Sequence, residues 1–165
     1  MRTRRLGKNG FEVSVLAMGA WQLADERYWG RGGDPERAVK TAIDCGITLF
    51  DTAEMYADGE SEKVLGRALG RDRDRVRIAS KAVSAHCAPA ALRAACEASL
   101  KRLRTDRIDL YQVHWPARDV PFADTAAEMR RLQQEGKILA AGVSNFGPQD
   151  LESWMAAGAA VSNQV

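Results

Sequence analysis

Net charge, cysteine and long apolar runs are all scarce in this chain of 165 residues. The formal net charge at pH 7 is +2, which argues against nucleic acid or an anionic membrane as a partner. No stretch reaches the length of a membrane-spanning helix, and no apolar run of a signal peptide follows the basic N-terminus. We therefore expect one globular domain over residues 1–165 that resides in the cytoplasm.

The three cysteines, Cys45, Cys87 and Cys96, are an odd number without the spacing of metal ligands. This pattern argues against a disulfide framework, and a reducing compartment fits it better. Cys45 and Cys96 fall inside helical patterns, where we expect them to be small buried apolar residues. No metal is expected, because the two histidines add no zinc-like spacing either.

Short β-like runs alternate with helical patterns along the whole chain. The predicted strands are Val13–Met18, Ile47–Phe50, Val76–Ser80, Ile108–Val113, Ile138–Val143 and Val161–Val165. The predicted helices are Pro35–Cys45, Ser61–Leu69, Pro89–Leu103, Ala123–Glu135 and Pro148–Ala157. Asp34 is typical of an N-cap before the first of these helices, and Gly46 of the glycine that ends it. Such alternation implies parallel strands joined by crossover helices.

Two architectures satisfy this alternation, an open doubly wound sheet and a closed (β/α)8 barrel. A dinucleotide-binding open sheet normally has Gly-x-Gly-x-x-Gly between its first strand and helix. Here the junction begins at Gly19 and continues for more than ten residues before the helix, without that pattern. This favours the barrel. The segment Leu6–Ser14, with Asn9-Gly10 between β-like flanks, predicts a hairpin that could close the bottom of the barrel.

Polar side chains that handle protons or hydrogen bonds recur where the predicted strands end. Asp51 ends the second strand, Tyr56 lies in the following loop, Lys81 ends the third strand and His114 ends the fourth. Ser144, Asn145 and Gln164 occupy the same place on the fifth and sixth strands. Each alone is more typical of a cap, a turn or a half-buried polar residue. Their coincidence at the C-terminal end of barrel strands predicts an active site.

At these residues the chain closely resembles the aldo-keto reductase family. The matching motifs are Phe50-Asp51-Thr52-Ala53-x-x-Tyr56, Gly59-x-x-Glu62-x-x-Leu65-Gly66, Ser80-Lys81, His114-Trp115-Pro116 and Gly142-Val143-Ser144-Asn145-Phe146. They cover the chain from Gly19 to its end in the family order. The resemblance implies a (β/α)8 barrel of the TIM type that reduces aldehydes or ketones to alcohols with NADPH, or alternatively NADH. It implies a catalytic tetrad of Asp51, Tyr56, Lys81 and His114, and cofactor contacts from Ala20, Trp21, Asp51, Ser144, Asn145 and Gln164.

Elementary electrostatics makes the tetrad chemically sensible. Hydride transfer to a carbonyl creates an alkoxide, which needs a proton donor. An ammonium about 4 Å from a phenol favours the phenolate by up to about 4 kcal/mol at an effective dielectric near 20. We therefore expect Lys81 to lower the pKa of Tyr56, the general acid, while Asp51 keeps Lys81 charged. His114 would orient the substrate oxygen.

The loops above the strand ends carry three tryptophans. Trp21, Trp29 and Trp115 are expected either to anchor loops or, as tryptophans do in related enzymes, to line the pocket of a small carbonyl substrate. His86 follows the third strand by a few residues, and we expect it to be a surface loop residue.

A complete barrel takes roughly 250 residues, so the chain is expected to be truncated to about six βα units and incomplete at its C-terminus. Three hypotheses follow. The first is a reductase that retains its chemistry. The second is a catalytically inactive barrel fragment that acts as an assembly or binding module and self-associates through exposed sheet edges. The third is an open α/β sheet of unrelated function.

Overall fold

The structure is a computed structural model that describes residues 1–8, 10–24, 33–158 and 160–165. An N-terminal hairpin consists of β1 (Thr3–Arg5) and β2 (Glu12–Ser14). The remaining strands are β3 (Ala17–Gly19), β4 (Leu49–Asp51), β5 (Arg77–Ala82), β6 (Ile108–Val113), β7 (Ile138–Ser144) and β8 (Asn163–Gln164). The helices are α2 (Pro35–Asp44), α3 (Glu60–Leu69), α4 (Pro89–Leu103), α5 (Phe122–Gln134) and α6 (Pro148–Ala157), with 3-10 turns η1 (Trp21–Leu23), η2 (Gly70–Arg75) and η3 (Ser84–His86). None of these helices is long and apolar enough to cross a membrane.

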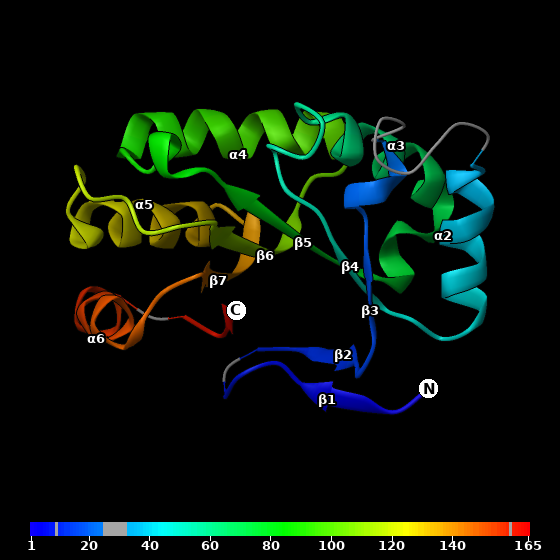
Figure 1. The fold of residues 1–165 in the computed structure, drawn as a ribbon, viewed down its shortest axis with the longest axis horizontal. Helices are drawn as coiled ribbons and strands as arrows, with labels where there is room; N and C mark the ends of the chain where they lie inside the picture. The colour runs from blue at the N-terminus through cyan, green and yellow to red at the C-terminus, as the bar shows by residue number, and fades with distance from the viewer. Residues whose placement is uncertain (9, 25–32, 159) are drawn as a thin grey trace.

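The six strands β3 to β8 form one sheet in which neighbours along the chain are also neighbours in space. Every pairing in this sheet is parallel. The sheet curls, and the helices lie along its outer side (Figure 1). A doubly wound sheet would reverse its strand order at a switch point, so the open-sheet hypothesis is wrong. The curled wall is that of a (β/α)8 barrel, as the sequence predicts.

The helices begin and end close to where local signals place them. The Asp34 side chain accepts a hydrogen bond from the Arg37 N–H at 2.9 Å and so caps α2. Gly46 follows the helix with a φ of 82°, a left-handed conformation that favours glycine. Cys45, at the C-cap of α2, is exposed. Its predicted burial is wrong, because the buried side of α2 consists of Val39, Ala42 and Ile43 and does not include the C-cap.

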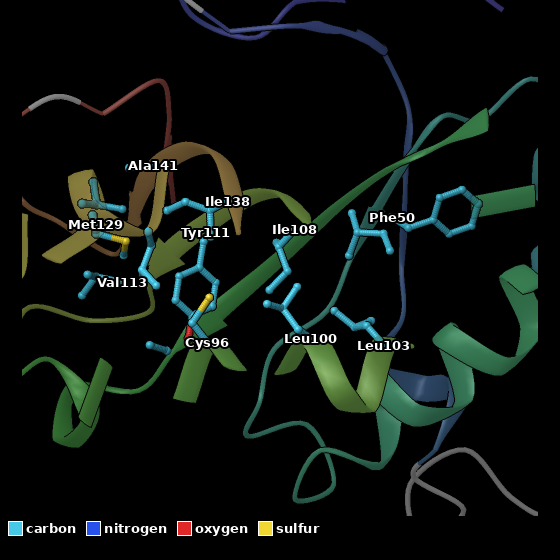
Figure 2. Packing of buried hydrophobic residues seen from close by; sticks show 14 of the residues in the cluster. Phe50, Cys96, Leu100, Leu103, Ile108, Tyr111, Val113, Met129, Ile138 and Ala141 are labelled. Carbon is cyan, nitrogen blue, oxygen red and sulfur yellow. The ribbon is translucent and has the colours of Figure 1, made fainter. Parts of the chain in front are cut away.

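The main hydrophobic core fills the layer between the sheet and the helices. Strand and helix side chains interlock there (Figure 2). The largest fully buried side chains include those of Trp154, Tyr111, Phe50, Leu92 and Met129. This layer holds the strand ends in place without occupying the inner face of the sheet.

A second, smaller cluster lies on the inner face. Leu6 and Phe11 of the hairpin pack against Ala79, Leu110 and Ala140 of three adjacent strands. The hairpin therefore covers the end of the curled sheet opposite the carboxyl ends of its strands, as predicted (Figure 1).

The predicted strand Val13–Met18 is wrong in its extent, because two strands share it. β2 ends at Ser14 and β3 begins at Ala17. Val15 and Leu16 between them are 43% and 58% exposed. At the end of the hairpin, the Ser14 N–H donates to the Thr48 hydroxyl and the Thr48 N–H donates to the Ser14 hydroxyl. This pair of hydrogen bonds directs the chain toward the barrel wall.

An ion cluster fixes β5 and β6 at the same end. The fully buried Asp109 accepts hydrogen bonds from Arg73 at 2.7 Å, from Arg77 at 2.9 Å and from the Ile78 N–H at 3.0 Å. The Arg77 guanidinium also lies 5.3 Å from the centre of the Phe11 ring. The carboxylate is thus fully paired, which burial of a charge requires.

Candidate active site

Three adjacent strands and their loops bring the predicted tetrad together. Asp51 is the last residue of β4, Lys81 lies near the end of β5 and His114 directly follows β6. Tyr56 is in the loop after β4. These strands are neighbours in parallel register, so their carboxyl ends meet at one edge, where barrel active sites form.

The loop that carries Tyr56 is held by hydrogen bonds to the strand ends. The Thr52 N–H donates to the Ala79 carbonyl at 2.9 Å, and the Thr52 hydroxyl shares a 2.9 Å hydrogen bond with Ser61 in α3. The Ser61 hydroxyl donates to the Ala20 carbonyl at 2.7 Å. At Gly59 the chain takes a φ of 81° before α3 begins. These contacts hold the loop against the barrel wall.

Lys81 is the centre of the arrangement and is 1% exposed. Its Nζ donates to Asp51 Oδ1 at 2.7 Å and to the Thr52 carbonyl at 2.9 Å, and it lies 3.5 Å from the Tyr56 hydroxyl. An ammonium has three N–H groups, and each one has an acceptor here. The Tyr56 oxygen can therefore accept from Lys81 while its own proton stays free for another acceptor.

Aromatic rings complete the wall around the phenol. The ring centroids of Tyr56 and His114 are 5.8 Å apart with an edge-on geometry, and those of His114 and Trp115 are 3.8 Å apart in a parallel stack. Trp21 lies 6.3 Å from Tyr56 between centroids. Trp21 and Trp115 are 46% and 39% exposed, so both present apolar surface at this edge. Trp29 lies outside the described residues.

The expectation that Lys81 lowers the pKa of Tyr56 is wrong for this site. Burial, followed by the charge of Asp51, raises the pKa of the phenol to about 12. The Asp51 carboxylate forms a close ion pair with Lys81, and it offsets the field of the ammonium at the phenol. Burial also lowers the pKa of Lys81, while Asp51 acts in the opposite direction. The phenol is consequently protonated at neutral pH.

His114 is a neutral imidazole in this setting. Burial, and then the nearby charge of Lys81, lower its pKa from 6.5 to about 4. Its Nδ1 is buried without a hydrogen-bond partner among the described residues. A neutral imidazole carries one N–H, so His114 can donate one hydrogen bond into the site without adding positive charge.

Residues at the end of β7, directly after it and in β8 reach the same edge from the other side. Asn145 adopts a φ of 59°, and its Nδ2 donates to the His114 carbonyl at 3.0 Å and to the Ser144 hydroxyl at 3.1 Å. The Ser144 hydroxyl donates to the Gln164 carbonyl at 2.9 Å. Gln164 Nε2 lies 3.4 Å from Asp51 Oδ2. The predicted cofactor residues thus form a hydrogen-bonded arc around the tetrad.

Ala20 is placed differently from the other predicted cofactor residues. It is fully buried in the core, its N–H donates to the Asp51 carbonyl at 2.8 Å, and its carbonyl accepts from Ser61. Ala20 therefore supports the floor of the site, while the neighbouring Trp21 is exposed at its edge.

Two acids beside the tetrad, the buried Glu62 and the partly buried Glu54, had no predicted role. Glu62 is fully buried and bonds the Ser80 hydroxyl at 2.5 Å and Arg102 Nε at 2.6 Å. Its signal in the sequence is a carboxylate beside the buried apolar positions of α3. Glu54 has a side chain that is 9% exposed and contacts His86 at 2.9 Å, and a partner so distant in sequence leaves no local signal. No cluster of acids, histidines or cysteines suited to a metal occurs among the described residues.

Comparison with known proteins gives these residues a family context. The sequence pattern of the Aldo/keto reductase family matches residues 15–165. An aldo-keto reductase of Bacillus subtilis, YhdN, is 39% identical over 94% of this chain and 50% of its own length. The methylglyoxal reductase YeaE of Escherichia coli is 39% identical over 93% of this chain and 54% of its own.

Solved structures agree with the sequence relatives. The thermostable aldo-keto reductase Tm1743, in complex with the inhibitor epalrestat, superposes with a TM-score of 0.90 at 33% identity, covering 100% of this chain and 62% of that one. An aldo-keto reductase from Klebsiella pneumoniae in complex with NADPH superposes with a TM-score of 0.85 at 37% identity, covering 100% and 58%. This chain spans about half the length of the curated relatives it matches. The motifs, the curled parallel sheet and these matches together show that the chain belongs to the aldo/keto reductase family.

Proposed function

We propose that this chain is an NADPH-dependent oxidoreductase that reduces aldehyde or ketone carbonyls to alcohols, with Tyr56 as the general acid. One observation carries the proposal. The buried Lys81 ammonium donates to Asp51 and the Thr52 carbonyl and lies 3.5 Å from the Tyr56 oxygen. This arrangement leaves a protonated phenol at the carboxyl edge of the barrel wall, with a cation behind it to stabilise the phenolate that proton transfer creates.

The hydrogen-bonding side chains of Ser144, Asn145 and Gln164 suit a nicotinamide cofactor. A carboxamide group offers two N–H donors and one acceptor, which amide and hydroxyl side chains can match. Neither Asn145 Oδ1 nor Gln164 Oε1 receives a hydrogen bond from the described residues. With Ser144 they would hold the carboxamide, and Trp21 and Asp51 would contact the rest of the nicotinamide end. The cofactor, when bound, supplies the hydride.

The direction of proton transfer follows from the pKa values of the site residues. Tyr56 keeps its proton at neutral pH because its pKa is about 12. An alkoxide is a stronger base than a phenolate, so the Tyr56 proton moves to the carbonyl oxygen once hydride has reached the carbonyl carbon. Lys81 stabilises the resulting phenolate, which regains a proton from solvent. His114, neutral at this pH, holds the substrate oxygen by its N–H.

The same arrangement supports a proposal for the substrate pocket. Trp21 and Trp115 present apolar surface beside the phenol, and with Trp29 we propose that they surround a small carbonyl compound. A reducing compartment such as the cytoplasm suits the three cysteines, none of which forms a disulfide.

Turnover of Tyr56→Phe tests the proposal. NADPH consumption is measured with methylglyoxal and with a simple aliphatic aldehyde, and cofactor binding is followed by quenching of tryptophan fluorescence. Loss of the general acid should lower kcat by roughly 10²- to 10⁴-fold and leave cofactor binding unchanged. Tyr111→Phe is the matched control, because Tyr111 is buried in the core between sheet and helices. A Tyr56→Phe variant as fast as wild type would refute the assigned role.

The second candidate function is assembly without catalysis. Within the described residues, β3 and β8 are the end strands of the sheet and each pairs with one neighbour. Unpaired strand edges invite pairing with another chain. Oligomers that bind no NADPH would favour assembly, whereas a monomer that binds NADPH and reduces an aldehyde would favour the reductase. Size-exclusion chromatography with light scattering separates these outcomes.

A further inference from the structure

The Glu54 carboxylate is hydrogen-bonded to the loop that follows β5. Its Oε1 accepts a hydrogen bond from the Val83 N–H at 2.7 Å and contacts His86 Nδ1 at 2.9 Å. Its backbone N–H donates to the Lys81 carbonyl at 3.2 Å. One residue therefore binds the chain at Lys81 and again at Val83, just beyond it.

The two hydrogen bonds of Glu54, to Lys81 and to Val83, continue the connection between β4 and β5 beyond the point where the strand pairing ends. The register between β4 and β5 ends at the pair Asp51 and Ala79. Beyond it, the loop that carries Tyr56 is joined to the end of β5 through the backbone and side chain of Glu54. Tyr56 follows Glu54 by two positions, and its hydroxyl is at the 3.5 Å limit of contact with Lys81. Small movements of this loop therefore decide whether the phenol and the ammonium meet.

His86 lies in a turn that connects the loop of Tyr56 to the loop that follows β6. In this turn, η3, the Ser84 hydroxyl donates to the Trp115 carbonyl at 3.2 Å. The Trp115 ring stacks on His114. To donate to a carboxylate, His86 must carry a proton on Nδ1. The turn thus ties the loop of Tyr56 on one side and the loop of His114 on the other.

We propose that Glu54, with His86 as its hydrogen-bond donor, is a positioning residue that holds Tyr56 against Lys81. The proposal rests on the reductase function proposed above, because it assigns Glu54 a part in the same proton transfer. The described contacts of the Glu54 carboxylate are with Val83 and His86 and not with the tetrad. Its carboxylate acts through the loop, where one oxygen accepts both hydrogen bonds.

Three variants test this inference. Glu54→Ala removes the acceptor, and misplacement of a catalytic group by about 1 Å can lower the rate roughly 100-fold. We expect a kcat loss of that order with little change in the KM for NADPH. Glu54→Gln keeps an oxygen that accepts from Val83 and His86 and should restore most of kcat. Glu60→Ala, an exposed acid in the first turn of α3, is the matched control and should behave as wild type.

A measurement without turnover separates this inference from the proposed function. The ¹³Cζ resonance of Tyr56, assigned with Tyr56→Phe, reports the titration of the phenol in the absence of cofactor. In Glu54→Ala the phenol should become more solvated, so its pKa should fall from about 12 toward 10.0. Glu54→Gln and Glu60→Ala should leave the resonance and its titration unchanged. If the wild-type chain reduces no aldehyde, the reductase proposal fails, and this titration still decides the placement of Tyr56.

Two results would overturn the inference. One is an unchanged Tyr56 resonance in a folded Glu54→Ala variant. The other is a Glu54→Gln variant that loses as much kcat as Glu54→Ala, because the hydrogen bonds alone would then not suffice. If Glu54→Ala does not fold, His86→Ala replaces it. His86 has a side chain that is 47% exposed, and its removal should shift Tyr56 in the same direction by a smaller amount; no shift would again refute the role.

Discussion

Acidification should destabilise this protein through His114. The side chain is 5% exposed at the carboxyl edge of the barrel wall. Burial and the nearby Lys81 ammonium lower its pKa from 6.5 to about 4. Both causes act only in the folded chain, since unfolding hydrates the imidazole and moves it away from Lys81.

The sign of the effect follows from proton binding. Between about pH 6.5 and about pH 4, the unfolded chain binds a proton at His114 and the folded chain does not. Unfolding therefore takes up a proton and becomes easier as the pH falls through this range. At about 1.4 kcal/mol per pKa unit, the lowered pKa corresponds to a loss of about 3 kcal/mol of unfolding free energy near pH 4. Above about pH 6.5 this contribution is constant.

Urea unfolding of wild type and His114→Gln at about pH 7.5 and about pH 4 measures the effect. Glutamine keeps a side-chain N–H but does not titrate, while all carboxylates titrate in both proteins and cancel in the difference. Wild type should lose about 3 kcal/mol more than the variant between the two pH values. Lys81→Met should also raise the pKa of His114, which NMR titration detects. Equal losses in the two proteins, or a His114 pKa near 6.5 in wild type, would contradict the reasoning.

Two further predictions concern stability away from the site. Asp109→Asn should lower the free energy of unfolding by about 3 kcal/mol, because it leaves Arg73 and Arg77 without their buried counter-charge; a urea midpoint close to wild type would show that water replaces the pair. Gly66→Ala should cost about 1 to 3 kcal/mol, because its Cβ would lie 2.4 Å from the Leu103 carbonyl oxygen. Thermal unfolding measures this loss, and an unchanged melting temperature would mean that α3 and α4 can separate freely.

The fold was predictable where one chain segment fixes its own structure. Helix Pro89–Leu103 and strand Ile108–Val113 have the predicted limits, because the first has a helical stripe and the second is a short apolar run next to clear turns. The run Val13–Met18 was divided differently, since apolar residues alone do not distinguish one strand from two strands with a bend. The chain bends between β2 and β3 because Ser14 and Thr48 exchange hydrogen bonds. These two residues are far apart in the sequence, so a local pattern cannot reveal their contact.

The positions of the candidate residues were predictable, but their electrostatics were not. Asp51, Tyr56, Lys81 and His114 could be placed at one edge because parallel strands point the same way. The pKa of Tyr56 could not be deduced from the proximity of Lys81 alone. Its direction depends on how deeply the phenol is buried and on where the Asp51 charge lies, and both are properties of the folded chain.

The geometry of the tetrad depends on fewer elements than the geometry of the arc around it. The ion pair of Lys81 and Asp51 joins the neighbouring strands β4 and β5, and the backbone N–H of His114, directly after β6, donates to the Ala82 carbonyl of β5. The contact of Gln164 with Asp51 instead links β8 to β4, which are not adjacent in the sheet order. Only the curvature of the sheet can bring these two residues together. The proposed proton transfer therefore relies on the register of adjacent strands, whereas the proposed nicotinamide site relies on the curl of the whole wall.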